Sequence, residues 1–185
     1  MRRSAILFLA GLTVAGCVGG PPPPARLPPD AFGGINLDND IGAINLAQWA
    51  FADAARLRGD PVDAARAAAA VDYLADELDQ SPRWVALSPI VKLQMQQARI
   101  EVRGALGIVP NAPSQAVTNG LLGAAAWLQA GNGAGALAAL ATPVFTLGPQ
   151  ATLARLTDLP FLRAANIATQ RAALYRNFPG CPGCR

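Results

Sequence analysis

Residues 60–80, DPVDAARAAAAVDYLADELDQ, carry the clearest folding signal in the chain. Apolar side chains recur there at steps of four, three and four residues, which places them on one face of an α-helix: Ala67, Val71, Leu74 and Leu78. Asp60 can cap this helix, and Pro61 suits its first position, where a missing N–H costs nothing. The stretch therefore predicts a long helix with one buried face.

The same spacing continues on both sides of this helix, and no stretch alternates with the period of a β-strand. We therefore predict an all-α domain over residues 36–178, an irregular bundle of about six to seven antiparallel helices. The helices expected besides the one after Asp60 are an early one ending at Gly59, 89–106, one opened by Pro113 and running to 128, two short ones within 133–158, and a last one from Pro160 to Tyr175.

Small side chains dominate the expected core. Of the 185 residues, 39 are Ala and only 6% are aromatic, so helix axes can approach closely but each residue buries little area. Gly120 and Gly123 are expected to mark one such close crossing. The larger side chains expected to anchor the core are Trp49, Phe51, Trp84, Trp127, Phe145 and Phe161.

Composition excludes several classes of function. The chain has no His, which removes Ser-His-Asp and Cys-His catalysis and zinc sites with His ligands. Its formal net charge of +3 is too weak for a dedicated nucleic-acid binder, and 15% charged residues are too few for a disordered, self-repelling chain. We expect neither a cofactor nor a metal, and no catalytic residues.

The N-terminus has the layout of a targeting segment. Arg2 and Arg3 precede an apolar stretch, residues 4–14, which is shorter than the roughly 20 residues that a membrane-spanning helix needs. The stretch ends in Val14-Ala15-Gly16-Cys17, and here the sequence resembles a bacterial lipoprotein precursor with its lipobox. The resemblance implies a signal peptide over residues 1–16, cleavage between Gly16 and Cys17, and a diacylglycerol and an acyl chain such as palmitate on Cys17.

On this resemblance, the mature protein is a component of the bacterial cell envelope, lipid-anchored and facing the periplasm. Val18 follows the lipidated Cys where Asp would retain such a protein at the inner membrane, so an outer-membrane location is favoured in a cell with two membranes. Two acyl chains or more give firm anchoring. The alternatives are an ordinary secretory signal cleaved near Ala15 and a retained single anchor.

Residues 17–35 form the expected linker between lipid and body. The segment 18–34, VGGPPPPARLPPDAFGG, contains six Pro and four Gly, and Pro21 to Pro24 favour an extended polyproline II conformation. We interpret it as a semi-rigid spacer that holds the body away from the lipid surface. The alternative is a proline-rich ligand for a partner groove, since the run satisfies the PxxP pattern.

Two acidic segments are candidates for chemistry. Asp72 and Asp76 lie one helical turn apart, with Glu77 and Asp79 nearby, and could bind a divalent cation or act as an acid–base pair. We interpret them as a solvated face bridged to Arg66 or Arg83. Residues 36–40, NLDND, begin like a calcium loop, but the required Gly and Glu are missing further on, so we interpret Asp38 or Asp40 as a helix cap.

The C-terminal tail, residues 179–185, contains Cys181-Pro182-Gly183-Cys184. A CxxC motif can be a redox pair or half of a zinc site, but no second CxxC and no His accompany it. With Cys17 lipidated, an even number of thiols remains, which suits an oxidising compartment. We therefore expect a Cys181–Cys184 disulfide; a redox or metal site, or a cross-link between two copies, are the alternatives.

The sequence contains two further, weaker patterns. Arg155, Arg163, Arg171 and Arg176 make a mildly basic surface near the C-terminus, either scattered solvating charge or a contact for anionic lipid. The turns around Gly59 and Gly131 resemble those of tetratricopeptide-type helical hairpins, although the 34-residue period is not kept.

These features predict a non-enzymatic envelope lipoprotein whose helical body binds an envelope protein or organises an assembly. The membrane lipid is its partner through the acyl anchor, and no nucleic-acid partner is expected. The alternative is a periplasmic carrier or sensor that holds an apolar small molecule in a helical pocket lined by Trp49, Trp84 or Trp127.

Overall fold

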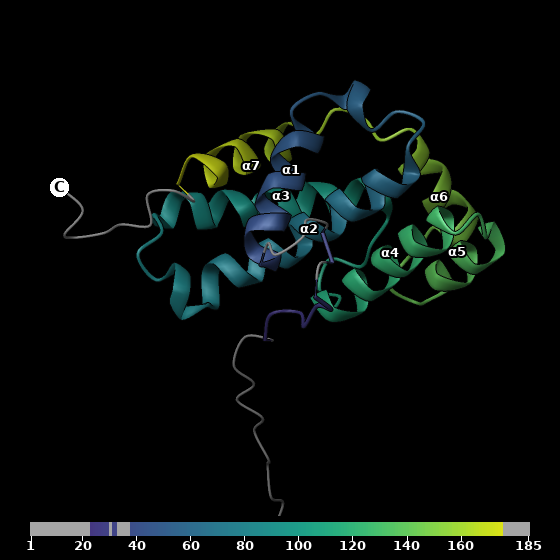
Figure 1. Cartoon of the computed structure of the whole chain (residues 1–185), viewed down its shortest axis with the longest axis horizontal. Helices are drawn as coiled ribbons and strands as arrows, with labels where there is room; N and C mark the ends of the chain where they lie inside the picture. The colour runs from purple at the N-terminus through teal and green to yellow at the C-terminus, as the bar shows by residue number, and fades with distance from the viewer. Residues whose placement is uncertain (1–22, 30, 33–37, 176–185) are drawn as a thin grey trace, which may run out of the picture.

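The computed structural model describes residues 23–29, 31–32 and 38–175. This part of the chain is all-α, with seven α-helices, two short 3₁₀ turns and no strand (Figure 1). The prediction of an irregular helical bundle is confirmed. The elements are α1 (Asn39–Phe51), η1 (Ala54–Arg56), α2 (Pro61–Gln80), η2 (Pro82–Trp84), α3 (Pro89–Leu106), α4 (Ser114–Gln129), α5 (Gly133–Leu140), α6 (Pro149–Thr157) and α7 (Arg163–Tyr175).

Helix α2 is the central element of the bundle. It packs against α1, α3, α4 and α6, and α7 in turn covers α1 and α3 (Figure 1). The sequence predicted a single buried face, but the alanines of residues 64–70 are all fully buried. The reason is that neighbours surround α2 on several sides, and side chains of one carbon let their axes come close.

Helix starts follow the caps expected from the sequence. Asp60 accepts hydrogen bonds from the backbone N–H groups of Val62 and Asp63 at 3.1 and 3.0 Å, and Pro61 occupies the first turn of α2. Asp38 accepts from the N–H of Ile41 at 2.9 Å and caps α1, which confirms the interpretation of Asp38 as a helix cap.

Two helix boundaries differ from the prediction. The first helix ends at Phe51 rather than Gly59, because the Asp53 side chain accepts from the N–H of Ala55 and starts the separate turn η1. The last helix begins at Arg163 rather than Pro160. At its start, the Glu101 carboxylate of α3 accepts from the N–H of Ala165 and supplies a partner for one of the first-turn amides.

Three of the six expected anchors are not in the core. Phe51, Trp84 and Phe145 are buried, but Trp49, Trp127 and Phe161 are 43%, 48% and 56% exposed. Trp49 instead lies under the guanidinium of Arg56, 5.8 Å from the ring centroid. The largest fully buried side chains are aliphatic and include Ile44, Leu57, Leu74, Leu78, Met95, Leu106, Leu121, Leu140 and Leu156.

The expected close crossing at Gly120 is confirmed. A Cβ atom at Gly120 would lie 2.5 Å from the ring of Phe145, and one at Gly123 would lie 3.4 Å from the Cβ of Ala139 in α5. The missing side chains therefore let α4 approach α5 and the loop after it.

The resemblance between the turns at Gly59 and Gly131 is local. Both glycines have a positive φ, +77° and +72°, and each precedes a capping residue, Asp60 or Asn132. The helices that follow have 20 and 8 residues, so the two hairpins are not copies of one repeat unit. In the described part of the chain, no helix is both long and apolar enough to cross a bilayer.

Candidate functional site

Several predicted sites cannot be placed in the fold. The lipobox with its cleavage position at Gly16 and Cys17, the Cys181–Cys184 pair and Arg176 lie outside the described residues. The sites that have a place in the fold lie in the helical body and in the described part of the predicted linker.

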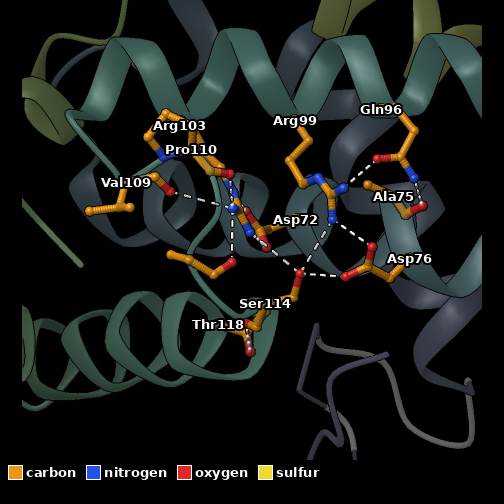
Figure 2. Close-up of polar contacts among 11 residues, drawn as sticks. Asp72, Ala75, Asp76, Gln96, Arg99, Arg103, Val109, Pro110, Ser114 and Thr118 are labelled. Carbon is orange, nitrogen blue, oxygen red and sulfur yellow. Dashed lines mark hydrogen bonds and ion pairs between the residues drawn. The ribbon is translucent and has the colours of Figure 1, made fainter. Parts of the chain in front are cut away.

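The expectation of a solvated acidic face at Asp72 and Asp76 is wrong. Both carboxylates are buried, and each is paired with an arginine of α3 rather than with Arg66 or Arg83 (Figure 2). Asp72 accepts from the Nε and Nη2 of Arg103 at 2.7 and 2.8 Å, a two-point ion pair in which both residues are less than 5% exposed. Burial of this kind requires a partner, because an unpaired charge in the core is costly.

A second ion pair joins three helices. Asp76 accepts from Arg99 Nη1 at 2.5 Å and from the hydroxyl of Ser114, at the start of α4, also at 2.5 Å. Arg99 donates in addition to the Gln96 side chain. Ser114 lies between the two ion pairs, within 3.5 Å of both guanidinium groups (Figure 2). The network therefore fixes α2, α3 and α4 relative to one another.

Arg103 also holds the loop between α3 and α4. Its Nη1 donates to the backbone carbonyls of Pro110 at 2.6 Å and Ala112 at 2.9 Å. These carbonyls belong to a loop, so no helical N–H donates to them, and Arg103 supplies the hydrogen-bond donor that they need. The donors of Arg103 and both oxygens of Asp72 are thus engaged within the protein, so this pair supports the fold rather than acid–base chemistry.

The sequence contained a signal for these pairs. Asp72 and Asp76 are four residues apart on one helix, and Arg99 and Arg103 are four residues apart on the next. In an antiparallel pair of helices, moving four residues toward the C-terminus on one helix corresponds to moving four residues toward the N-terminus on the other. The same alignment of the two helices therefore places Asp72 beside Arg103 and Asp76 beside Arg99. The acidic pair could be interpreted correctly only together with the arginine pair that follows it.

A cleft runs beside this network. Two adjoining cavities of about 440 and 380 Å³ share five lining residues: Gln96, Arg99, Arg103, Pro110 and Asn111. Two of the charged residues that line it, Arg99 and Arg103, are already neutralised, since they are paired with Asp76 and Asp72. The cleft is lined by both polar and apolar side chains, and these ion pairs offer it no uncompensated charge.

A third buried carboxylate, Asp40, connects α1 to α2 and η2. It accepts from the hydroxyl of Tyr73 at 2.6 Å, the indole N–H of Trp84 at 2.8 Å and Arg83 Nη1 at 3.1 Å. Burial, and then the neighbouring Asp40 carboxylate, raise the pKa of the Tyr73 phenol well above its usual value. Burial likewise raises the pKa of Glu77 on the same helix. The sequence analysis missed this cluster.

Part of the predicted spacer lies on the body. We call residues 23–29 and 31–32 the strap; its Ala25 and Phe32 are buried in the core, and the Phe32 ring centroid is 5.9 Å from that of Tyr73. Arg26 and Gln115 of α4 exchange two hydrogen bonds, from Arg26 N–H at 2.7 Å and to its carbonyl at 3.0 Å. The strap is therefore bound structure rather than a free spacer.

One face of α3 exposes large apolar side chains. Ile90, Leu93 and Ile100 are 60%, 60% and 71% exposed, and their spacing places them along one line of the helix. We call them the apolar stripe. Of the predicted basic surface, Arg155, Arg163 and Arg171 are exposed, and Arg171 donates to Gln94 of α3 at 3.1 Å.

The three tryptophans do not share one environment. Trp84 is buried against Asp40, whereas Trp49 lies near Arg56 and Trp127 lies against Gly135 of α5. Comparison of the chain with protein-family models, with curated proteins and with solved structures gives no match.

Proposed function

We propose that this protein is a bacterial envelope lipoprotein, anchored through lipid on Cys17, whose helical body binds another envelope protein. The apolar stripe of α3 is the observation that carries the second half of this proposal. Three large aliphatic side chains are exposed to water in line on one helix face, which is unfavourable. Their burial against a partner surface would lower the free energy.

The anchor is proposed from residues 1–17. A short basic start, an apolar stretch of limited length and the Val14-to-Cys17 sequence occur together at the correct end of the chain. Lipid on Cys17 would hold the mature protein at a membrane surface, facing the periplasm, and Val18 favours the outer membrane where there are two.

We propose a binding role rather than an enzymatic one. The two buried ion pairs use their carboxylates and guanidinium groups to fix the fold, and Asp40 is engaged by three donors. A helical body that is rigid in its centre and apolar on one exposed face is suited to presenting that face to a partner.

The anchor is tested with Cys17→Ala in cells fed a labelled fatty acid. We expect the label to disappear and the protein to leave the membrane fraction, because the thiol that carries the lipid is gone. Unchanged membrane association of an unlabelled protein would contradict the anchor.

The binding role is tested with a photo-crosslinking residue at position 93. The matched control carries it at position 161, where Phe161 is similarly exposed but lies outside the stripe. We expect one discrete cross-linked product from position 93 that Ile100→Asp abolishes. Equal products from both positions would contradict a specific role for α3.

A further inference from the structure

We propose that the lobe formed by α4, α5 and the loop after α5, residues 114–148, is the face of the body that rests on the lipid headgroup region. We call it the uncharged lobe. This inference rests on the lipid anchor proposed at Cys17, and it adds which surface of the body meets the membrane.

The lobe belongs to an unusual stretch of sequence. None of the 51 residues from 104 to 154 is Asp, Glu, Lys or Arg, whereas an average stretch of that length carries about a dozen charges. Charged side chains resist transfer from water to a less polar surface, since they must lose hydration. A face without them can approach the headgroup region without that penalty.

The exposed side chains of the lobe suit such an interface. Trp127 of α4 is 48% exposed and Leu147 is 45% exposed. An open apolar groove of about 360 Å³ lies nearby, lined by Gly120, Ala139, Pro143 and Val144 among others. Tryptophan is the residue most typical of the boundary between water and lipid, because its ring is apolar and its N–H is polar.

The strap favours a membrane as the occupant, because it places the start of α4 near the proposed lipid anchor. It meets the body at the start of α4, through the paired hydrogen bonds of Arg26 with Gln115. Eight residues lead from Cys17 to the buried Ala25, which allows at most about 29 Å between them. Helix α4 is about 24 Å long, so the tether is long enough for either end of α4 to reach the bilayer surface.

The basic surface on α7 is less suited to this contact. In Figure 1, α7 lies along the edge of the molecule opposite to the strap. Arg163 and Arg171 on this helix are exposed. Contact through the uncharged lobe also predicts weak dependence on salt and on anionic lipid, whereas contact through these arginines would depend strongly on both.

The test uses the full lipidated protein in phosphatidylcholine vesicles with brominated acyl chains, which quench nearby tryptophan emission. Trp49→Phe leaves Trp127 as the exposed tryptophan, and the matched control Trp127→Phe leaves Trp49, which is similarly exposed. We expect brominated lipid to quench Trp49→Phe and to leave Trp127→Phe nearly unchanged. Neither added salt nor added phosphatidylglycerol should alter this difference.

A charge placed in the lobe gives a second measurement. Ala126→Glu, at an exposed position of α4, should reduce the quenching, while Ala86→Glu, exposed near η2, should not. Quenching of Trp49 in place of Trp127 would overturn the inference. So would a Trp127 that is shielded from aqueous quenchers yet unaffected by brominated lipid, which would indicate a second copy or another protein on the lobe.

The outcomes separate this inference from the proposed anchor. If Cys17 carries no lipid, the protein will not float with the vesicles, and the anchor and this inference both fail. If the protein floats but Trp127 is not quenched, the anchor stands and the uncharged lobe is not the contact.

Discussion

Among single substitutions, we expect the largest loss of stability when the buried pair of Asp72 and Arg103 is broken. Arg103→Met should lower the free energy of unfolding by about 3–5 kcal/mol, because it leaves a carboxylate unpaired in the core and frees the carbonyls of the 109–112 loop. Denaturant unfolding measures this change. The double variant Asp72→Leu with Arg103→Met should recover much of the loss; a double variant as unstable as Arg103→Met would contradict the ion-pair explanation.

Tyr73 predicts how stability depends on alkaline pH. The phenol of the unfolded chain loses its proton near pH 10, whereas burial and Asp40 keep the folded phenol protonated to higher pH. The unfolded state therefore binds fewer protons above pH 10, and the free energy of unfolding should fall as the pH rises through that range. Below pH 10 this contribution is complete.

The control for this prediction is Tyr73→Phe. It should lower stability at neutral pH by about 1–3 kcal/mol, since Asp40 loses one of its three donors. It should also flatten the decline above pH 10, as followed by denaturant midpoints from pH 8 to 11. An equally steep decline in Tyr73→Phe would assign the alkaline sensitivity to another group.

At the scale of elements, two glycines make a matched comparison. Gly120→Ala should destabilise the protein by about 1–3 kcal/mol, because the new methyl group would meet the buried Phe145 ring at 2.5 Å. Gly104→Ala, in α3 with nothing within 4 Å of its Cβ, should be stabilising by about 0.5–1 kcal/mol. Thermal unfolding of both variants tests this. Equal effects on the unfolding temperature would mean that packing of α4 against α5 and Phe145 does not require glycine at position 120.

Helix positions were predictable where a capping residue and a proline occur together, as at Asp60-Pro61 and Ser88-Pro89. The prediction failed where a polar side chain competes with the helix, as Asp53 does after Phe51. The ion pairs were missed for a different reason. Their charges lie on separate helices, and only the antiparallel register brings Asp72 to Arg103.

At the scale of the whole molecule, the strap was the least predictable feature. Its composition is typical of a solvated spacer, and proline content alone does not reveal that Ala25 and Phe32 find buried positions against the body. In the proposed lipid-anchored protein, the tether is shortened as a result, because only the residues before Ala25 would remain to span the gap. Under that proposal, the distance between lipid and body would be set by tertiary contacts as well as by linker length.

Limited proteolysis with trypsin tests whether the strap is bound, because the peptide bond between Arg26 and Leu27 is a trypsin site. We expect slow cleavage there, because the Arg26 N–H and carbonyl are both bonded to Gln115 and Ala25 is buried. Phe32→Ser should accelerate it by removing the ring that packs on Tyr73, while Pro29→Ala, at an exposed strap position, should not. Rapid cleavage of the unaltered protein would show that the strap detaches. In the proposed lipid-anchored protein, a detached strap would let the body move away from the membrane by the added length of chain.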